Sequence, residues 1–273
     1  MPGTSNWLSH TRSTDPASFG PQIALLRSDI VSLNESIQKL LVHTDCLTLY
    51  DIDTSSMTNI SRATLPVQER LRKLAISDHL DFSEGRQPAD REVGTCRDFA
   101  IFLCSFLRTH GIPARVRCGF ASYFGEGWWD HWICEYCLPD TDAWLRADAE
   151  LDRTVCEAYN ITFDTLNMPQ GTFLTAGEAW IECRSGRLSP DEFGHGDHKG
   201  LWFISMNVAR DSLSLNGQEM SPWDTWRKAR PEVRQLSHHQ LLRVDQLASH
   251  PERLPDQLTP PWLMLSSDSQ VSN

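Results

Sequence analysis

The chain has 273 residues, of which 40% are hydrophobic, and a formal net charge of −11. This apolar fraction is sufficient for a buried core, and the length suits one large domain or a core with an extension. The acidic character argues against nucleic acid and anionic membranes as partners, because both would repel it. No apolar run approaches the roughly 20 residues that span a bilayer. We therefore expect neither nucleic acid nor a membrane as a partner.

The amino-terminal part predicts a flexible segment, residues 1–20, followed by two helices. Apolar residues recur at gaps of three and four after Pro21, which predicts an amphipathic helix. Its heptads are few, so packing on the domain is favoured over a coiled coil. A second helix is expected to start at Thr64 and Pro66. The apolar positions are Ile23, Leu26, Ile30, Leu33, Ile37 and Leu40 in the first helix and Val67, Leu71 and Leu74 in the second.

The most informative segment is residues 94–100, Gly-Thr-Cys-Arg-Asp-Phe-Ala. Thr95 can cap a helix and Asp98 can complete a capping box, so a helix is predicted to begin at Cys96. Unpaired N–H groups and the positive end of the helix dipole favour the thiolate of Cys96, which is the nucleophilic form. Buried packing is the more common role of a cysteine on an apolar helix, and we expect it for Cys104. The helix is predicted to end before Gly111.

Two strands and a turn are predicted to follow. Residues 112–120 alternate apolar with polar side chains, and residues 131–136 are rich in aromatic and apolar ones. After a turn at residues 139–142, residues 144–148 form the next predicted strand. Asp148 would then lie where it can orient His131 from the neighbouring strand.

These segments resemble, in order, the transglutaminase-like superfamily with its papain-like core. The matching pieces are the helix start at residues 94–100, the Gly-Ile-Pro-Ala-Arg exit at 111–115, the His strand at 131–135 and the Trp-x-x-x-Asp strand at 144–148. The resemblance covers residues 65–152. Trp132 stands one position earlier than the family's tryptophan. No upstream oxyanion donor is recognisable before Cys96, which leaves its backbone N–H as the expected donor.

The resemblance implies an α+β fold with an active-site helix packed on an antiparallel sheet and extra helices at both ends. It implies a catalytic triad of Cys96, His131 and Asp148 that forms a thioester acyl-enzyme from an amide, ester or thioester. No cofactor or metal is expected. The donor would be a small molecule or peptide and the acceptor an amine or water. The aromatic loop before His131 provides the candidate substrate contacts, Tyr123, Trp128 and Trp129.

Two alternatives stay open. The same residues would serve a cysteine peptidase or glycan-releasing amidase, and a catalytically silent member would use the cleft to bind a peptide or partner. The eight cysteines are scattered and residues 1–7 lack the features of a signal sequence, so we expect reduced thiols and a cytoplasmic protein. Cys134 and Cys137 have the spacing of half a zinc site, but on a strand they point to opposite faces.

The remaining chain is expected to extend the same domain, residues 21–265, with a carboxy-terminal extension at 153–265 and a disordered tail at 266–273. Residues 201–206 are interpreted as a buried strand and residues 175–183 as a short helix. Residues 222–230 and 231–247 are interpreted as two helical stretches. His195, Asp197 and His198 lie in a Gly-rich loop that is expected to be solvated, with metal or substrate contact as the alternative. The sequence leaves the oligomeric state open.

Overall fold

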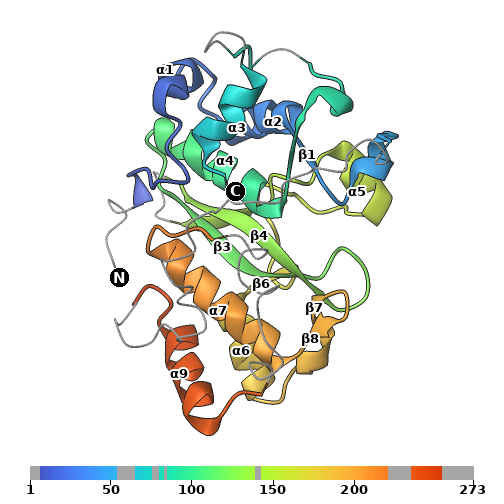
Figure 1. Cartoon of the computed structure of the whole chain (residues 1–273), viewed down its shortest axis with the longest axis vertical. Helices are drawn as coiled ribbons and strands as arrows, with labels where there is room; N and C mark the ends of the chain where they lie inside the picture. The colour runs from blue at the N-terminus through green and yellow to red at the C-terminus, as the bar shows by residue number, and fades with distance from the viewer. Residues whose placement is uncertain are drawn as a thin grey trace, which may run out of the picture.

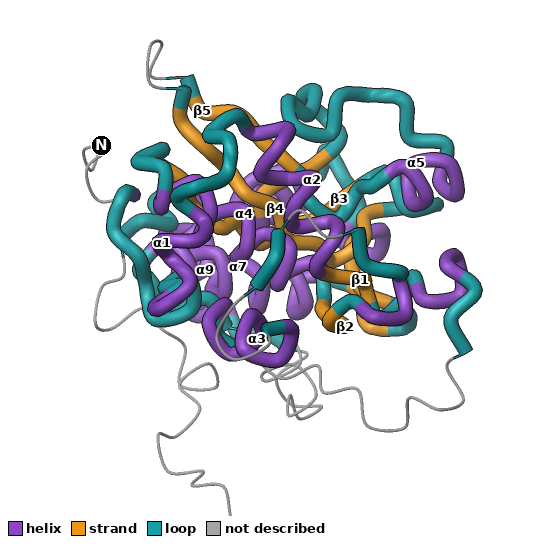
Figure 2. The backbone as a smooth tube through the Cα atoms, turned by 90° about the horizontal axis from the view of Figure 1, so that it is seen from above, coloured by secondary structure: helices purple, strands orange, loops and turns teal. Residues whose placement is uncertain are grey.

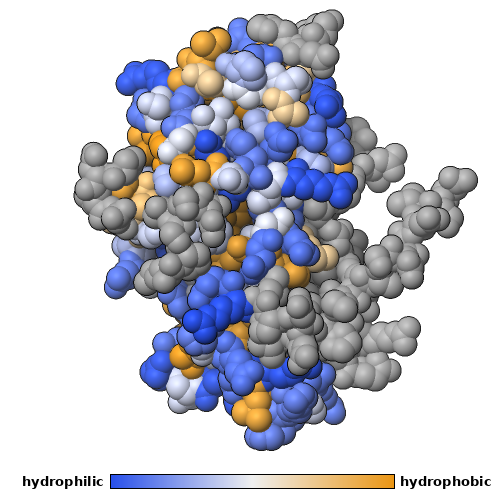
Figure 3. Space-filling model, turned by 90° about the vertical axis from the view of Figure 1, so that its left-hand side faces the viewer, coloured by the Kyte–Doolittle hydropathy of each residue, from blue (hydrophilic) through white to orange (hydrophobic). Residues whose placement is uncertain are grey.

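The computed structural model of the chain describes residues 7–53, 65–75, 80–82, 85–138, 143–220 and 235–253. Figure 1 shows a central sheet with one group of helices on each side, which is the α+β architecture expected from the sequence. No helix among these residues is long and apolar enough to span a bilayer. Figure 3 shows that hydrophilic residues cover much of the visible face, with apolar residues in small groups.

The central sheet has the strand order β6-β3-β4-β7-β8, and β5 pairs with β4. The bounds are β3 (Ala114–Ala121), β4 (Trp128–Cys137), β5 (Trp144–Ala147), β6 (Phe173–Thr175), β7 (Phe193–His195) and β8 (His198–Lys199). β4 runs antiparallel to β3 and β5 and parallel to β7, with Gly119 opposite His131. A Cβ at Gly119 would lie 2.1 Å from the carbonyl oxygen of Leu174, so β6 can approach only a glycine. The three strands predicted between residues 112 and 148 are confirmed.

Helices α1 (Gly20–Ile23), α2 (Ile30–Leu40), α3 (Val67–Leu74) and α4 (Cys96–Thr109) lie on one side of the sheet. Helix α4 packs on β3 and β4, and α2 packs beside α4 (Figure 2). Apolar residues of these helices and of one sheet face form the larger core. Beside them, β1 (Leu41–His43) pairs in parallel with β2 (Glu92–Gly94).

The predicted helix after Pro21 is divided into α1 and α2. Asp29 caps α2, because its Oδ1 accepts a hydrogen bond from the Ser32 N–H at 2.9 Å, and this gives the chain a new helix start. The predictions of α3 and of α4 with its capping box are confirmed. Residues 7–20, which were expected to be flexible, include the buried side chains of Trp7, Thr14 and Phe19.

Helices α6 (Ala176–Arg184), α7 (Leu201–Leu215) and α9 (His238–Ser249) cover the other face and enclose a second core, while α5 (Arg153–Tyr159) lies to one side (Figure 1). Single 3-10 turns occur at Ala17–Phe19, Leu47–Tyr50, Pro88–Asp90 and Pro190–Glu192. The helix predicted at residues 175–183 is confirmed as α6. Residues 222–230, 231–234 and 266–273 lie outside the described residues.

The strand interpretation of residues 201–206 is wrong, because they form the first turns of α7. A short apolar run does not distinguish a buried strand from a buried helix. The helix is buried along most of its length, since one side faces the sheet and another faces α6 and α9. Its sequence therefore lacks the amphipathic pattern that would have revealed it.

Candidate active site

Cys96 is the first residue of α4, and buried side chains fix this end of the helix. The Thr95 N–H donates to Asp98 Oδ2 at 2.8 Å, and the Thr95 hydroxyl donates to the same oxygen at 3.1 Å. Buried Arg70 donates to Asp98 Oδ2 at 2.9 Å and to the Val93 carbonyl at 2.8 Å. As the first helical residue, Cys96 has a backbone N–H without an acceptor inside the helix.

His131 and Asp148 are joined by a hydrogen bond of 2.7 Å between Nε2 and Oδ2. His131 lies on β4, and Asp148 follows directly after β5, which pairs with β4. The Tyr123 hydroxyl donates to the same Oδ2 at 2.5 Å. The bond to Asp148 occupies Nε2, so Nδ1 is the ring atom that can exchange a proton with another group.

The sulfur of Cys96 lies close to the imidazole. Cys96 Sγ, a ring nitrogen of His131 and a carboxylate oxygen of Glu150 all lie within 4.8 Å of one another. The backbone N–H of Trp132 donates to the sulfur. The structure therefore brings together Cys96, His131 and Asp148, the three residues that the sequence singled out, and adds Glu150 to them.

The electrostatics differ from the expected thiolate. Burial raises the pKa of the Cys96 thiol, and the nearby carboxylates of Glu150, Asp130 and Asp148 raise it further. These effects outweigh the hydrogen bond from the Trp132 N–H, so the net pKa is raised and the thiol form is favoured. Burial lowers the pKa of His131, but the charge and hydrogen bond of Asp148 more than offset it, and the net pKa is raised. His131 is therefore a strengthened base beside a protonated thiol.

A cavity of about 140 Å³ opens at the sulfur. Phe124, Trp129 and Tyr159 provide aromatic walls, and the described residues that line it include no lysine or arginine. The remaining lining residues are His43, Asp45, Cys46, Thr95, Cys96, Asp130, His131, Glu150 and His195. The cavity is thus aromatic on one part of its wall and acidic on another.

The three predicted substrate contacts have different positions. Trp129 lines the cavity and is 36% exposed. Tyr123 bonds Asp148 from behind, with its ring edge-on to His131. Trp128 stacks on Phe193 with the rings 5.5 Å apart and nearly parallel, and it packs against the second core instead of lining the cavity. Only one of the three aromatic side chains therefore faces the space beside the sulfur.

Sequence reasoning missed four polar residues of the cavity wall: His43, Asp45, Cys46 and Glu150. The register of β1 with β2 places His43 beside Gly94, two residues before Cys96. Glu150 follows Asp148 by two residues. This closeness to the family motif was the one feature of the sequence that could have indicated Glu150 as a site residue. Burial raises the pKa of Glu150, partly offset by His43 and His131. In the part of the chain that the structure describes, two sets of residues could hold a metal ion: His43 with Cys46 and Glu150, and Cys96 with His131 and Glu150.

His195 is the member of the Gly-rich loop that reaches the cavity, from the end of β7. Cys104 is fully buried on α4, as expected for packing. Cys134 on β4 shares a hydrogen bond with Cys104. All eight cysteines are free thiols.

Comparison with known proteins gives a family match for part of the chain. Residues 62–149 match the transglutaminase-like superfamily, which confirms the resemblance for this segment. A comparison with curated proteins gives no match. A solved structure, described as a candidate cysteine protease from Cytophaga hutchinsonii, is similar with 14% sequence identity and a TM-score of 0.38. The similarity covers 57% of this chain and 44% of that one, so this chain spans less than half of the solved protein.

Proposed function

We propose, starting from the transglutaminase-like match of residues 62–149, that this protein transfers an acyl group through a thioester on Cys96. One observation carries the proposal: Tyr123, Asp148 and His131 form a hydrogen-bonded chain that ends beside the Cys96 sulfur at an open cavity. The family match supports cysteine-dependent catalysis in general. The geometry supports specific roles for the side chains.

In the proposed reaction, His131 takes the proton of Cys96 through Nδ1 while the sulfur attacks a carbonyl carbon. Asp148 stabilises the imidazolium that forms and holds the ring in the productive orientation. The backbone N–H of Cys96, which has no acceptor inside the helix, would donate to the developing oxyanion. His131 then protonates the leaving group, and the acyl group remains on sulfur as a thioester. A second nucleophile, activated by His131, releases it.

The cavity supports an amine as that second nucleophile. Asp45, Asp130 and Glu150 line it, and its described lining residues include histidines but no lysine or arginine. A cavity of this charge attracts a cation, including a protonated amine that gives up its proton before attack. The volume of about 140 Å³ suits one small group or side chain. We therefore propose amide formation on a small molecule or peptide, with hydrolysis by water as the competing outcome.

The first test uses p-nitrophenyl acetate as a generic acyl donor. Cys96 should release p-nitrophenolate in a burst, and intact mass should rise by one acetyl group. The Cys96→Ala variant should show neither effect, whereas Cys156→Ser, which removes another half-buried thiol, should retain both. Acetylation distributed over several cysteines, or a burst that survives Cys96→Ala, would contradict the proposal and favour a binding module.

The second test separates transfer from hydrolysis. The acylated protein is incubated with hydroxylamine or with a primary amine, and the products are identified by mass. Amide or hydroxamate formation that competes with water is the expected result. If free acid is the only product despite abundant amine, the protein is not a transferase, and an amidase or peptidase is the remaining hypothesis.

A further inference from the structure

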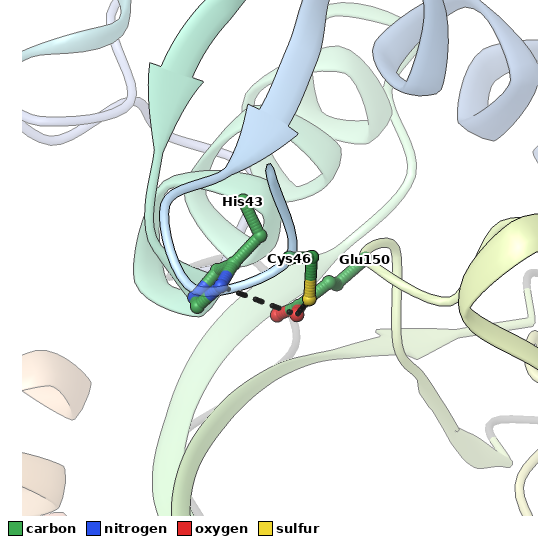
Figure 4. Close-up of side chains that lie close together, drawn as sticks. All are labelled: His43, Cys46 and Glu150. Carbon is green, nitrogen blue, oxygen red and sulfur yellow. Dashed lines mark hydrogen bonds and ion pairs between the residues drawn. The ribbon is translucent and has the colours of Figure 1, made fainter. Parts of the chain in front are cut away.

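A second group of side chains lies in the cavity wall, beside the proposed catalytic residues. Figure 4 shows His43, Cys46 and Glu150 pointing toward one another, from the end of β1, the loop after it and the loop after β5. His43 Nδ1 lies 3.7 Å from Glu150 Oε1, and Cys46 Sγ lies 3.8 Å from the same oxygen. None of the three transfers a proton or attacks a carbonyl in the mechanism proposed above, in which Glu150 contributes only its charge to the cavity.

We propose that His43, Cys46 and Glu150 bind a divalent transition metal, with Zn²⁺ as the best match. Imidazole nitrogen, thiolate sulfur and carboxylate oxygen are the donors that zinc takes in proteins. Bonds of about 2.0–2.3 Å in a tetrahedral site separate such donor atoms by roughly 3.3–3.8 Å. The two separations observed here lie within this interval, so a small adjustment of side chains would complete the site.

An unsatisfied carboxylate oxygen independently points to a ligand. Glu150 is 4% exposed, and its Oε2 has no hydrogen-bond partner among the described residues. A buried carboxylate without its full set of partners is costly. A cation held by this carboxylate would supply the missing charge and contact.

The hydrogen bond that His43 makes in the structure leaves a ring nitrogen suited to a metal. The Asp45 N–H donates to His43 Nδ1 at 3.1 Å, so this nitrogen carries no proton and has the lone pair a metal requires. The metal would replace that hydrogen bond. Zinc binds cysteine as the thiolate, so binding would release the proton of the Cys46 thiol.

The position of the site implies regulation. Glu150 also lies within 4.8 Å of Cys96 Sγ and a His131 ring nitrogen, so a metal held by Glu150 stands close to the nucleophile. Three protein ligands leave one coordination position open, and the cavity is adjacent. A bound metal would obstruct the approach of an acyl donor. The ion is thus expected to inhibit acylation of Cys96 and to take no part in it.

The test uses the full chain carrying Cys96→Ala, in which the proposed nucleophile cannot bind metal and no acylation occurs. Zn²⁺ is titrated in competition with a chromophoric chelator, and one equivalent should bind. Cys46→Ser and Glu150→Gln should each weaken binding at least ten-fold, whereas Cys156→Ser should not change it. Co²⁺ provides a spectroscopic reading, because thiolate ligation gives a charge-transfer band that Cys46→Ser should remove.

Three results would overturn the site: no stoichiometric Zn²⁺ binding by the Cys96→Ala protein, unchanged affinity in both Cys46→Ser and Glu150→Gln, or a Co²⁺ spectrum without a thiolate band. Circular dichroism checks that each variant is folded. If Cys46→Ser does not fold, His43→Gln takes its place in the affinity comparison. This binding measurement is independent of the acyl-transfer proposal, since it uses a protein without Cys96.

Discussion

Two buried charge clusters share strand β4, and they differ in how their carboxylates are balanced. Around Glu135, every carboxylate faces arginine. Around His131, four residues earlier on β4, the carboxylates face imidazoles and thiols. The first arrangement stabilises the charged carboxylate, whereas the second favours protonated groups at the cavity.

The arginine cluster joins three strands to α7. Glu135 accepts hydrogen bonds from Arg115 and Arg117 at 2.7 Å and from Arg146 at 3.1 Å. Arg117 also forms a two-bond pair with Asp211 of α7 at 2.9 and 2.8 Å. Burial raises the pKa of Glu135, but the three arginines outweigh this and lower it to about 2. Glu135 is therefore ionised at any physiological pH.

In the cavity cluster, no arginine among the described residues pairs with the carboxylates, and the pKa values of Cys96 and His131 are raised instead of lowered. Glu150, Asp148 and Asp130 surround Cys96 and His131, and they raise the pKa of both. The pKa of Glu150 is itself raised. A set of groups with perturbed pKa values in a cavity is a candidate functional site. Four substitutions measure how far the two clusters differ.

Asp148→Asn should have the largest effect. The amide keeps the shape but removes the charge that stabilises the imidazolium, so the burst rate with p-nitrophenyl acetate should fall on the order of 10³-fold. Asp148 raises the pKa of His131, so its loss lowers that pKa. Because His131 must be unprotonated to accept the thiol proton, the acid limb of the rate profile should move to lower pH. An unmoved limb would contradict the assigned role of Asp148.

Glu135→Gln should act on stability instead. A pKa of about 2, against 4.5 for a free glutamate, corresponds to about 3 kcal/mol. A depressed carboxyl pKa stabilises the fold above pH 4.5 and loses this contribution as the pH falls toward 2. Urea unfolding should therefore show a large loss for Glu135→Gln at pH 7 and a smaller one at pH 3. Glu157→Gln, in an exposed pair with Arg153, should change little and serves as the control.

Tyr123→Phe should weaken the catalytic chain without removing a charge. The hydroxyl donates to Asp148, and hydrogen bonds to charged groups contribute about 1.5–3 kcal/mol. We expect an acylation rate lower by about ten-fold. Tyr136→Phe is the matched control, since this hydroxyl donates to the Leu166 carbonyl away from the cavity. Equal rates for the two variants would show that Tyr123 only packs.

Glu150→Gln should produce the smallest change, and in the opposite direction. After burial, Glu150 is the largest cause of the raised pKa of Cys96, so neutralising it lowers that pKa. The pH profile of iodoacetamide alkylation of Cys96 should shift to lower pH, with a rate gain of less than about ten-fold near neutrality. A profile that coincides with the unmodified protein would show that Glu150 is uncharged there.

Much of the fold around the site could be predicted because its signals are local. The capping box at Thr95 and Asp98, the glycine at position 111 and the strand patterns on either side of the aromatic loop each depend on a few adjacent residues. Together they indicated α4, β3, β4 and β5. Residues 201–206 were wrongly predicted as a strand. A helix that is buried on several sides is apolar all round and lacks the 3.6-residue hydrophobic period that identifies an amphipathic helix.

The site residues that the sequence analysis missed lie far from Cys96 in the sequence or belong to no recognisable motif. His43 reaches Cys96 only through the parallel pairing of β1 with β2, across about 50 residues that contain no shared motif. Glu150 is close to Asp148 in sequence, but an isolated glutamate after a strand has no distinguishing pattern. Trp128 and Trp129 are adjacent and identical in type, yet the pleat of β4 directs one to the core and the other to the cavity.

The sequence by itself determined the order of elements and the three side chains on which the proposed chemistry depends, because caps, turns and strand alternation act between near neighbours. Only the tertiary structure decided the protonation of these side chains. The state of Cys96 depends on burial and on carboxylates brought from other elements, and both are properties of the packed chain. A helix start that favours a thiolate in isolation therefore holds a protonated thiol in this protein.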